Sequence, residues 1–225
     1  MSHQSPGRPG REDEERRVEA LYDSVAGLYE VLYPSLHHYR ARVEDFLSSH
    51  VMPGMRVLDV GCGGGQLTRA LPPSVEVVGI DLSERMLEVA RAGRPHGRYL
   101  QHSYTEPLPP ELGRFDVAVA AGCLDYCTDL GATLANLARA LREGGLLLFS
   151  VLEQRDDLPG HEASSRTLNG TEPPVTLRFW SRDRCEEAIA RAGLLALASE
   201  HAPAFEIESE GLALHYRWWR VGRAR

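Results

Sequence analysis

The sequence contains no long hydrophobic run, and no apolar stretch approaches the ~20 residues that a membrane-spanning helix needs. Residues 1–17 are rich in Ser, Pro, Gly and charged residues and contain no apolar segment of the kind that secretory signal peptides carry. From these two absences we expect a cytoplasmic protein with no membrane partner.

Cysteine is also scarce, with four residues, at positions 62, 123, 127 and 185. So few thiols favour a reducing compartment over a disulfide scaffold. Cys123 and Cys127 stand four residues apart, but no second Cys or His pair accompanies them to complete a zinc site. We therefore expect buried free thiols and no metal.

An excess of positive charge is missing as well. The chain has 25 Lys and Arg against 32 Asp and Glu, which gives a formal net charge of −7. This balance does not favour binding to nucleic acid or to an anionic membrane. The length of 225 residues and the 43% hydrophobic content suit one α/β domain with an elaboration, large enough to bury a full core.

What the sequence does have is a distinctive glycine-rich stretch, Arg56–Gln66 (RVLDVGCGGGQ). Its first half is a short, β-favouring apolar run, which predicts a buried strand. Its second half is a tight turn, where glycine can adopt positive φ. Apolar residues from Leu67 onward predict that a helix follows. A strand, a glycine turn and a helix N-terminus would bring backbone N–H groups and a positive dipole end close to a ligand.

The glycine spacing distinguishes between nucleotide-like ligands. A dinucleotide-binding G-x-G-x-x-G pattern starting at Gly61 would need a glycine where the chain has Gln66, so a nicotinamide cofactor is disfavoured. What remains is Asp59-x-Gly61-x-Gly63-x-Gly65. This segment resembles motif I of the class I S-adenosylmethionine-dependent methyltransferases. A purely structural strand-to-helix connection is the alternative interpretation.

The resemblance implies a Rossmann-like, doubly wound α/β fold: a seven-stranded, mostly parallel sheet with an antiparallel last strand. We expect strands at 56–60, 75–81, 98–102, 115–120, 146–152, 194–199 and 212–221, the last two as an edge hairpin. Helical periodicity predicts helices over 12–33, 36–47 and 130–141, and others capped by Ser83 and Ser181. We expect Gly144 and Gly145 to terminate the helix 130–141. The expected organisation is a disordered segment 1–11, an N-terminal helical lid 12–50, and a methyltransferase domain 51–225 with an insertion at 153–180.

The cofactor site follows from the carboxyl ends of the expected strands. Asp81 ends the second strand, where a carboxylate can accept both ribose hydroxyls. The family commonly has an acid after the third strand, facing the adenine amino group; Ser103 occupies that position here. The segment Tyr22-Asp-x-x-Ala26-x-x-Tyr29 resembles the aromatic lid of small-molecule methyltransferases, although a half-buried helix face would give the same pattern. The expected cofactor-binding residues are Tyr22, Asp59, Gly61, Cys62, Gly63, Gly65, Asp81, Leu82, Ser103, Tyr104 and Gly122.

The expected reaction is in-line transfer of a methyl group from S-adenosylmethionine to O or N of a small-molecule acceptor, in a monomer or homodimer. Alignment of the reactants can lower the barrier by about 7–11 kcal/mol, whereas a general base contributes roughly 10²–10⁴-fold. A base is therefore optional; the candidates are Asp125, His38 and His161. A nucleic-acid methyltransferase is disfavoured by the absence of a basic domain and of an Asn/Asp-Pro-Pro-Tyr motif. A regulatory protein that binds the cofactor without transferring methyl is the alternative from a different class.

Overall fold

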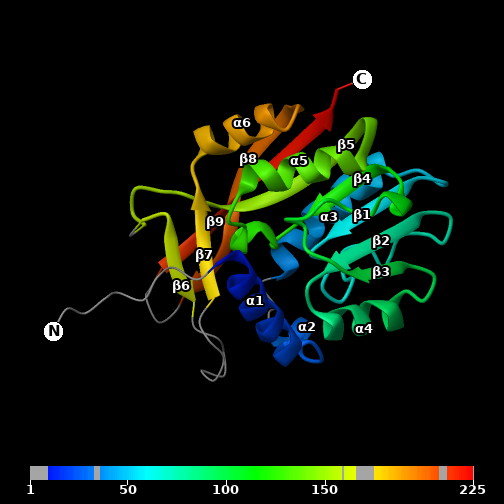
Figure 1. Ribbon diagram of the computed structural model, residues 1–225, viewed down its shortest axis with the longest axis horizontal. Coiled ribbons are helices and arrows are strands. Elements are labelled where there is room, and N and C mark those ends of the chain that lie inside the picture. The colour runs from blue at the N-terminus through cyan, green and yellow to red at the C-terminus, as the bar shows by residue number, and fades with distance from the viewer. Residues whose placement is uncertain (1–9, 33–35, 159, 166–174, 208–211, 225) are drawn as a thin grey trace.

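The computed structural model describes residues 10–32, 36–158, 160–165, 175–207 and 212–224, apart from the side chains of residues 32, 36–38, 163–165 and 207. The expected disordered segment 1–11 lies outside these residues as far as residue 9, and Arg11 already begins a helix. Figure 1 shows a twisted sheet through the middle of the molecule with helices packed around it. None of the helices in the described ranges is long and apolar enough to cross a membrane.

The described residues form nine strands and six α-helices. The strands are β1 (Arg56–Val60), β2 (Glu76–Asp81), β3 (Arg98–Gln101), β4 (Phe115–Ala120), β5 (Leu141–Glu153), β6 (Glu162–Ser165), β7 (Val175–Trp180), β8 (Leu194–Ile207) and β9 (Leu212–Arg223). The helices are α1 (Arg11–Val25), α2 (Tyr29–Leu32), α3 (Leu36–His50), α4 (Glu84–Gly93), α5 (Leu130–Ala140) and α6 (Arg182–Arg191). Two short 3₁₀ turns are η1 (Pro110–Leu112) and η2 (Leu124–Tyr126).

Strand pairing confirms the expected fold class. Strands β3, β2, β1, β4 and β5 lie side by side and parallel, β9 pairs antiparallel with β5, and β8 pairs antiparallel with β9. Strand order reverses at β1, which has β2 on one side and β4 on the other. In open parallel sheets the ligand crevice lies at the carboxyl ends of the strands beside such a reversal.

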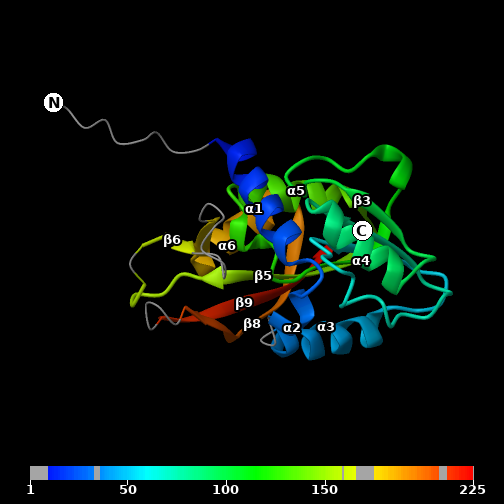
Figure 2. The same ribbon diagram turned by 90° about the horizontal axis from the view of Figure 1, so that it is seen from below.

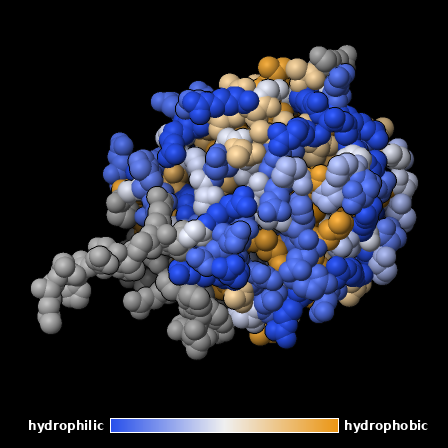
Figure 3. All heavy atoms as spheres, viewed as in Figure 1, coloured by the Kyte–Doolittle hydropathy of each residue, from blue (hydrophilic) through white to orange (hydrophobic). Residues whose placement is uncertain are grey.

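Two apolar layers cover the two faces of the sheet. On one face, buried side chains of α5 and α6, such as Leu134 and Ile189, pack against the central strands. On the other face, Val43 and Leu47 of α3 pack against β1, β4 and β9. Figure 2 shows α5 and α6 on the side of the sheet opposite α3. The face in Figure 3 is mainly hydrophilic, with hydrophobic residues in small separate areas, as expected for a chain with 25% charged residues.

Local capping signals placed two helices correctly. Ser83 caps α4 by accepting a hydrogen bond from the Met86 N–H, and Ser181 caps α6 by accepting from the Arg184 N–H. A serine hydroxyl at the residue before a helix satisfies one of the N–H groups that has no partner inside the helix.

The structure corrects four details of the expected elements. No α-helix follows the glycine turn: residues 67–70 form turns, because Pro72 and Pro73 leave too little chain for a helix. The expected helix 12–33 breaks between α1 and α2 around Gly27, a residue that disfavours helix interiors. Residues 144–145, expected to terminate a helix, lie inside β5. The insertion 153–180 is partly regular, since β6 and β7 form a ribbon beside β5.

Candidate active site

A tight glycine turn follows β1 at the strand-order reversal. Gly61, Gly63 and Gly65 adopt φ values of 60°, 52° and 73°, in the left-handed region that glycine reaches without strain. A Cβ at position 61 would stand 2.3 Å from Cβ of Cys123, so the chain after β4 can approach only because this residue is glycine. Gly65 lies at the far end of the turn, against Ala90 of α4. The turn therefore exposes the backbone of Gly61 and Gly63 to the cavity at the ends of the strands.

Asp59, expected to bind the cofactor, lies beneath the turn rather than on the cavity wall. Its side chain is 1% exposed, and Thr68 Oγ1 donates a 2.7 Å hydrogen bond to Asp59 Oδ2. Burial raises the pKa of Asp59 to about 7, and the Thr68 hydrogen bond partly offsets that rise. Asp59 therefore contacts Thr68, in the segment after the turn, and supports that segment.

Asp81 is the last residue of β2, and two backbone N–H groups hold its carboxylate. Oδ2 accepts a 2.8 Å hydrogen bond from the Gly63 N–H, and Oδ1 accepts a 2.9 Å hydrogen bond from the Ser83 N–H. Burial raises the pKa of Asp81, and these backbone hydrogen bonds act against the rise. Each carboxylate oxygen retains acceptor capacity, because a carboxylate offers about four acceptor positions. Asp81 is thus fixed in orientation beside the glycine turn.

The loop after β4 forms the opposite wall. The Gly122 N–H donates to Ser150 Oγ at 2.9 Å, and Tyr104 Oη donates to the Cys123 carbonyl at 3.1 Å. Gly122 has φ of 70°, and a Cβ there would lie 3.4 Å from Tyr216 Oη and from the Tyr39 ring. The glycine therefore leaves open space in front of two tyrosines.

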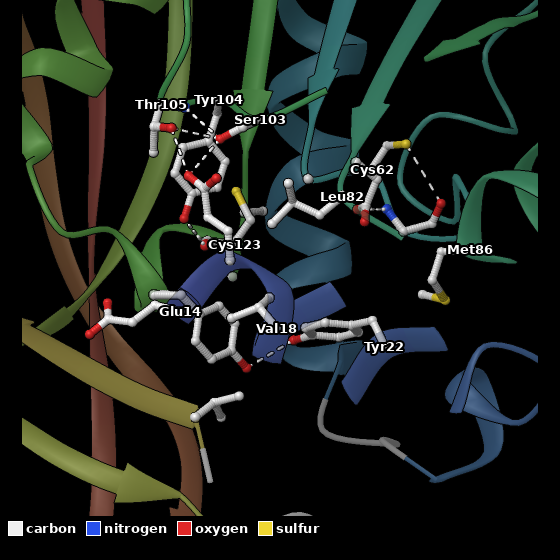
Figure 4. Close-up of a pocket in the computed structure, with 18 of the residues that line it drawn as sticks. Glu14, Val18, Tyr22, Cys62, Leu82, Met86, Ser103, Tyr104, Thr105 and Cys123 are labelled. Atoms are coloured by element: carbon white, nitrogen blue, oxygen red, sulfur yellow. Dashed lines mark hydrogen bonds between the residues drawn. The ribbon is translucent and has the colours of Figure 1, made fainter. Parts of the chain in front are cut away.

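Helix α1 crosses the cavity from the other side (Figure 4). Glu14, Val18 and Tyr22 of this helix line the cavity together with Cys62 and Leu82, which lie at the ends of β1 and β2. Tyr22 Oη lies 3.0 Å from Tyr126 Oη, which joins α1 to the loop after β4. Burial raises the pKa of Tyr22 well above its usual value, so the phenol stays neutral and able to donate.

The main cavity brings together nine of the eleven expected cofactor-binding residues, which come from α1 and the ends of β1, β2, β3 and β4. They are Tyr22, Gly61, Cys62, Gly63, Asp81, Leu82, Ser103, Tyr104 and Gly122. Asp59 and Gly65 belong to the turn but are not among its lining residues. Within the described residues, no cluster of three or more His, Cys, Asp or Glu side chains could hold a metal ion.

Of the three candidate bases, the structure describes the side chains of Asp125 and His161, and it does not bring these two together. Asp125 is 3% exposed and is not among the lining residues; Oδ2 accepts a 2.8 Å hydrogen bond from Tyr216 Oη. His161 lines a second hollow that adjoins the main cavity, and its Nδ1 lies 2.8 Å from Gln154 Oε1. The side chain of His38 lies outside the described residues.

Several lining residues carry no sequence signal of a site. Glu14 and Arg178, 164 positions apart, form an ion pair of 2.5 Å on the cavity wall. In the sequence, Glu14 is one of several charged residues of α1, and Arg178 is a charged residue in β7, so neither indicates a site. Only the packing of α1 against β7 gives them a common role.

Burial of Asp125 predicts a particular pH dependence of stability. Burial raises the pKa of Asp125 to about 8, so its proton binds more tightly in the folded chain than in the unfolded chain. The stability that this proton contributes is complete below the unfolded pKa of about 4 and is lost as pH rises through about 8. Relative to wild type, Asp125→Asn should therefore gain free energy of unfolding as pH rises through this window.

Urea denaturation at several pH values from about 4 to about 9 checks this difference. The matched control is Asp129→Asn, which makes the same change at the exposed cap of α5, where Asn also caps well. A free-energy difference between Asp125→Asn and wild type that stays constant with pH would contradict the prediction.

The chain matches two models of methyltransferase families. A family model described as a methyltransferase domain matches residues 57–145, and one described as protein-L-isoaspartate(D-aspartate) O-methyltransferase matches residues 14–96. A malonyl-acyl-carrier protein O-methyltransferase of Serratia marcescens is 34% identical over 60% of this chain and 52% of its own. The chain thus spans about half the length of the curated relatives that it matches first.

Two solved structures share the fold over most of the chain. One is a 1,6-didemethyltoxoflavin-N1-methyltransferase of Burkholderia thailandensis, with a TM-score of 0.70, 18% identity, and coverage of 99% of this chain and 94% of that chain. The other is the cyclase SpnF, with a TM-score of 0.68, 18% identity, and coverage of 92% and 95%. At these identities, both establish the fold.

Proposed function

We propose that this chain, which matches a methyltransferase-domain model over residues 57–145 and has the fold of class I S-adenosylmethionine-dependent methyltransferases, transfers a methyl group to an oxygen or nitrogen atom of a small-molecule acceptor. One observation carries the proposal. A single cavity is lined by the glycine turn, Asp81 and Gly122 and also by tyrosines, of which Tyr39 lies beside Gly122. We assign the turn and Asp81 to the cofactor, and the part lined by the tyrosines to an acceptor.

The residues suit this cofactor. Asp81 presents a carboxylate whose two oxygens are oriented by backbone donors, as a ribose diol with two hydroxyl donors requires. At Gly63 a Cβ would meet Met86 Cε at 2.9 Å, so the glycine keeps the turn close to α4. Leu82 and Met86 add apolar surface of the kind that a flat base packs against. When bound, the cofactor supplies an electrophilic methyl group on a sulfonium.

The chain's own part at the acceptor end is to hold the acceptor and to exclude water. Tyr22, Tyr29, Tyr39 and Tyr126 line this end of the cavity. Burial raises the pKa of Tyr39 as it does that of Tyr22, so both phenols remain neutral hydrogen-bonding groups. A methyl acceptor held in line gains most of its rate from orientation, which can lower the barrier by about 7–11 kcal/mol.

Among the base candidates, Asp125 is the one that we propose for an acceptor that must lose a proton. Tyr216 Oη donates to Asp125, and the same hydroxyl lies 3.4 Å from the Cβ position of Gly122 on the cavity wall. When Asp125 is ionised, which its pKa of about 8 favours at pH above that value, a proton leaving an acceptor would pass to Tyr216 Oη while Tyr216 gives its own proton to Asp125. An amine that arrives neutral needs no such step, and alignment then suffices.

The setting of the reaction is also a proposal. We place it in the cytoplasm, in a monomer or homodimer, without a nucleic-acid or membrane partner. The net charge of −7 and four free cysteines support this assignment. In the expected organisation, the lid ends at residue 50 and contains helices α1, α2 and α3. The ribbon of β6 and β7 contributes Arg178 to the lining of the cavity, on the side that we assign to the acceptor.

A binding protein that does not transfer methyl is the second candidate. The fold by itself does not fix the reaction, since one structure that shares it is named as a cyclase. Incubation with cofactor labelled in its methyl group and a panel of phenols, alcohols and amines separates the two candidates. Label in any acceptor supports transfer, whereas cofactor binding without label in any acceptor supports the binding role.

The first test of the proposal is ligand choice. We expect S-adenosylhomocysteine to bind and NAD not to bind, because the turn has Gln66 where a dinucleotide fingerprint has glycine. Calorimetric titration with each ligand measures this. Binding of NAD without binding of S-adenosylhomocysteine would contradict the proposed function.

A further inference from the structure

Helix α1 presents three carboxylates, one turn apart, to the strand ends of the cofactor half. Residues 15, 19 and 23 share one face of the helix, because four-residue steps bring side chains above one another. Asp23 accepts from Ser83 Oγ at 2.5 Å, Glu19 from Gln101 Nε2 at 3.0 Å, and Glu15 from the loop after β3. The helix is therefore docked on β2 and β3 through acids.

Glu15 differs from the other two, because it also lines the main cavity. Its Oε1 accepts hydrogen bonds from Ser103 Oγ at 2.9 Å and from Thr105 Oγ1 at 2.7 Å. Both hydroxyls line the cavity too. The two hydroxyl oxygens also lie 2.7 Å from each other, so their hydrogens bond within the group formed by Ser103, Thr105 and Glu15. The only negative charge among these three side chains is on the helix.

The position of this group in the sheet indicates what it meets. Asp81 ends β2, beside the glycine turn, and β3 is the next strand outward. A nucleoside whose ribose lies on Asp81 therefore has its base at the end of β3, where Ser103 and Thr105 stand. An exocyclic amino group of the base needs an acceptor there. A carboxylate with two hydroxyl donors on one oxygen still has acceptor capacity.

We propose that Glu15 is the residue that recognises the amino group of the cofactor's adenine, with Ser103 and Thr105 holding its carboxylate in place. The inference rests on the proposed function. It makes α1 a part of the cofactor site: the base is read by a residue of the helix that covers the cavity, and not by the sheet. Cofactor affinity then depends on whether α1 is docked.

The test compares S-adenosylhomocysteine with S-inosylhomocysteine, in which a carbonyl replaces the 6-amino group. The wild-type chain should prefer the adenine ligand by at least about tenfold, since a hydrogen bond to a charged group is lost and a carbonyl faces the carboxylate. Glu15→Gln should reduce this preference to within about threefold, because the amide can donate to the carbonyl as well as accept from an amino group. Calorimetry measures both affinities.

Glu19→Gln is the matched control. It makes the same charge change one turn along the same helix face, at a residue outside the cavity lining that contacts Gln101. It should keep the wild-type preference even if it loosens the helix. Thr105→Val, which removes one of the two donors that hold Glu15, should lower the preference without removing charge.

The outcomes separate a role in recognition from a role in docking. Equal loss of both ligands in Glu15→Gln, with the preference unchanged, would show that Glu15 only docks the helix and would overturn the inference. A wild-type chain that binds S-adenosylhomocysteine without preferring it to the inosine ligand would overturn the inference and leave the proposed function standing. A wild-type chain that binds neither ligand would defeat the proposed function, and the inference with it.

Discussion

Asp81→Asn should lower the affinity for S-adenosylhomocysteine by about 10²-fold or more. The carboxylate is expected to accept two hydroxyls of the ribose, and a hydrogen bond to a charged group contributes about 1.5–3 kcal/mol. Two such bonds correspond to at least about 10² in the dissociation constant. The amide loses the charge, and its NH₂ group would also face the N–H of either Gly63 or Ser83, where both oxygens now accept.

Calorimetry of both proteins measures the affinity, and circular dichroism shows whether the variant is folded. Asp129→Asn serves again as the control for a carboxylate-to-amide change, because this residue caps α5 and is not among the residues that line the cavity. An affinity of folded Asp81→Asn within about threefold of wild type would show that the ribose does not lie on this carboxylate.

Arg178→Gln should release the first turns of α1. Arg178 is buried, and it donates to Glu14 of α1 at 2.5 Å and to the Tyr126 carbonyl at 3.1 Å. Its Nε also lies 3.3 Å from Glu162. Removal of one partner from a buried ion pair costs about 3–5 kcal/mol, because a buried charge is left without compensation. Glu14 can avoid that cost by moving into water, which requires that the start of α1 leave β7.

Hydrogen exchange locates the effect. Protection of the amides of residues 15–20 should fall by about 10²-fold or more, while amides of β1 and β4 keep their wild-type protection. Arg182→Gln is the control, since it breaks an exposed ion pair with Glu186, an interaction that contributes less than about 1 kcal/mol. In the double variant Glu14→Gln/Arg178→Gln no uncompensated charge remains, so part of the protection should return.

Two results would contradict this account. Unchanged protection of α1 in Arg178→Gln would mean that other contacts, such as the acids of the same helix against β2 and β3, suffice to hold the helix. Equal loss of protection in α1 and in the central strands would mean that the ion pair stabilises the whole fold and not the lid.

Much of the fold could be predicted because its signals are local. The apolar runs in 56–60 and 115–120 match β1 and β4, since each run is bounded by turn-forming residues. Ser83 and Ser181 begin helices as expected, because a cap is a contact between near neighbours in the chain. The glycine turn could be predicted for the same reason, because its positive φ values depend on its own residues.

The errors arose where local signals competed. Residues 67–71 have a helical pattern, yet Pro72 and Pro73 end the segment before a helix can form. The segment 153–180 has the composition of an irregular loop, but Val175–Trp180 pairs with the end of β5 and so becomes strand β7. Pairing between strands depends on a partner strand elsewhere in the chain, and the composition of one segment does not indicate which strand that is.

The sequence by itself determined the cofactor half of this protein: the turn at Gly61, the acid at 81 and the topology that aligns their strand ends. Those features depend on residues close together in the chain and on rules of strand connection that hold for any parallel sheet. Only the tertiary structure decided the other half. Glu14 meets Arg178 over 164 positions, Glu15 meets Ser103 over 88, and Asp125 meets Tyr216 over 91. Such contacts arise when whole elements pack, and no periodicity or propensity within one element specifies which distant side chain it will meet.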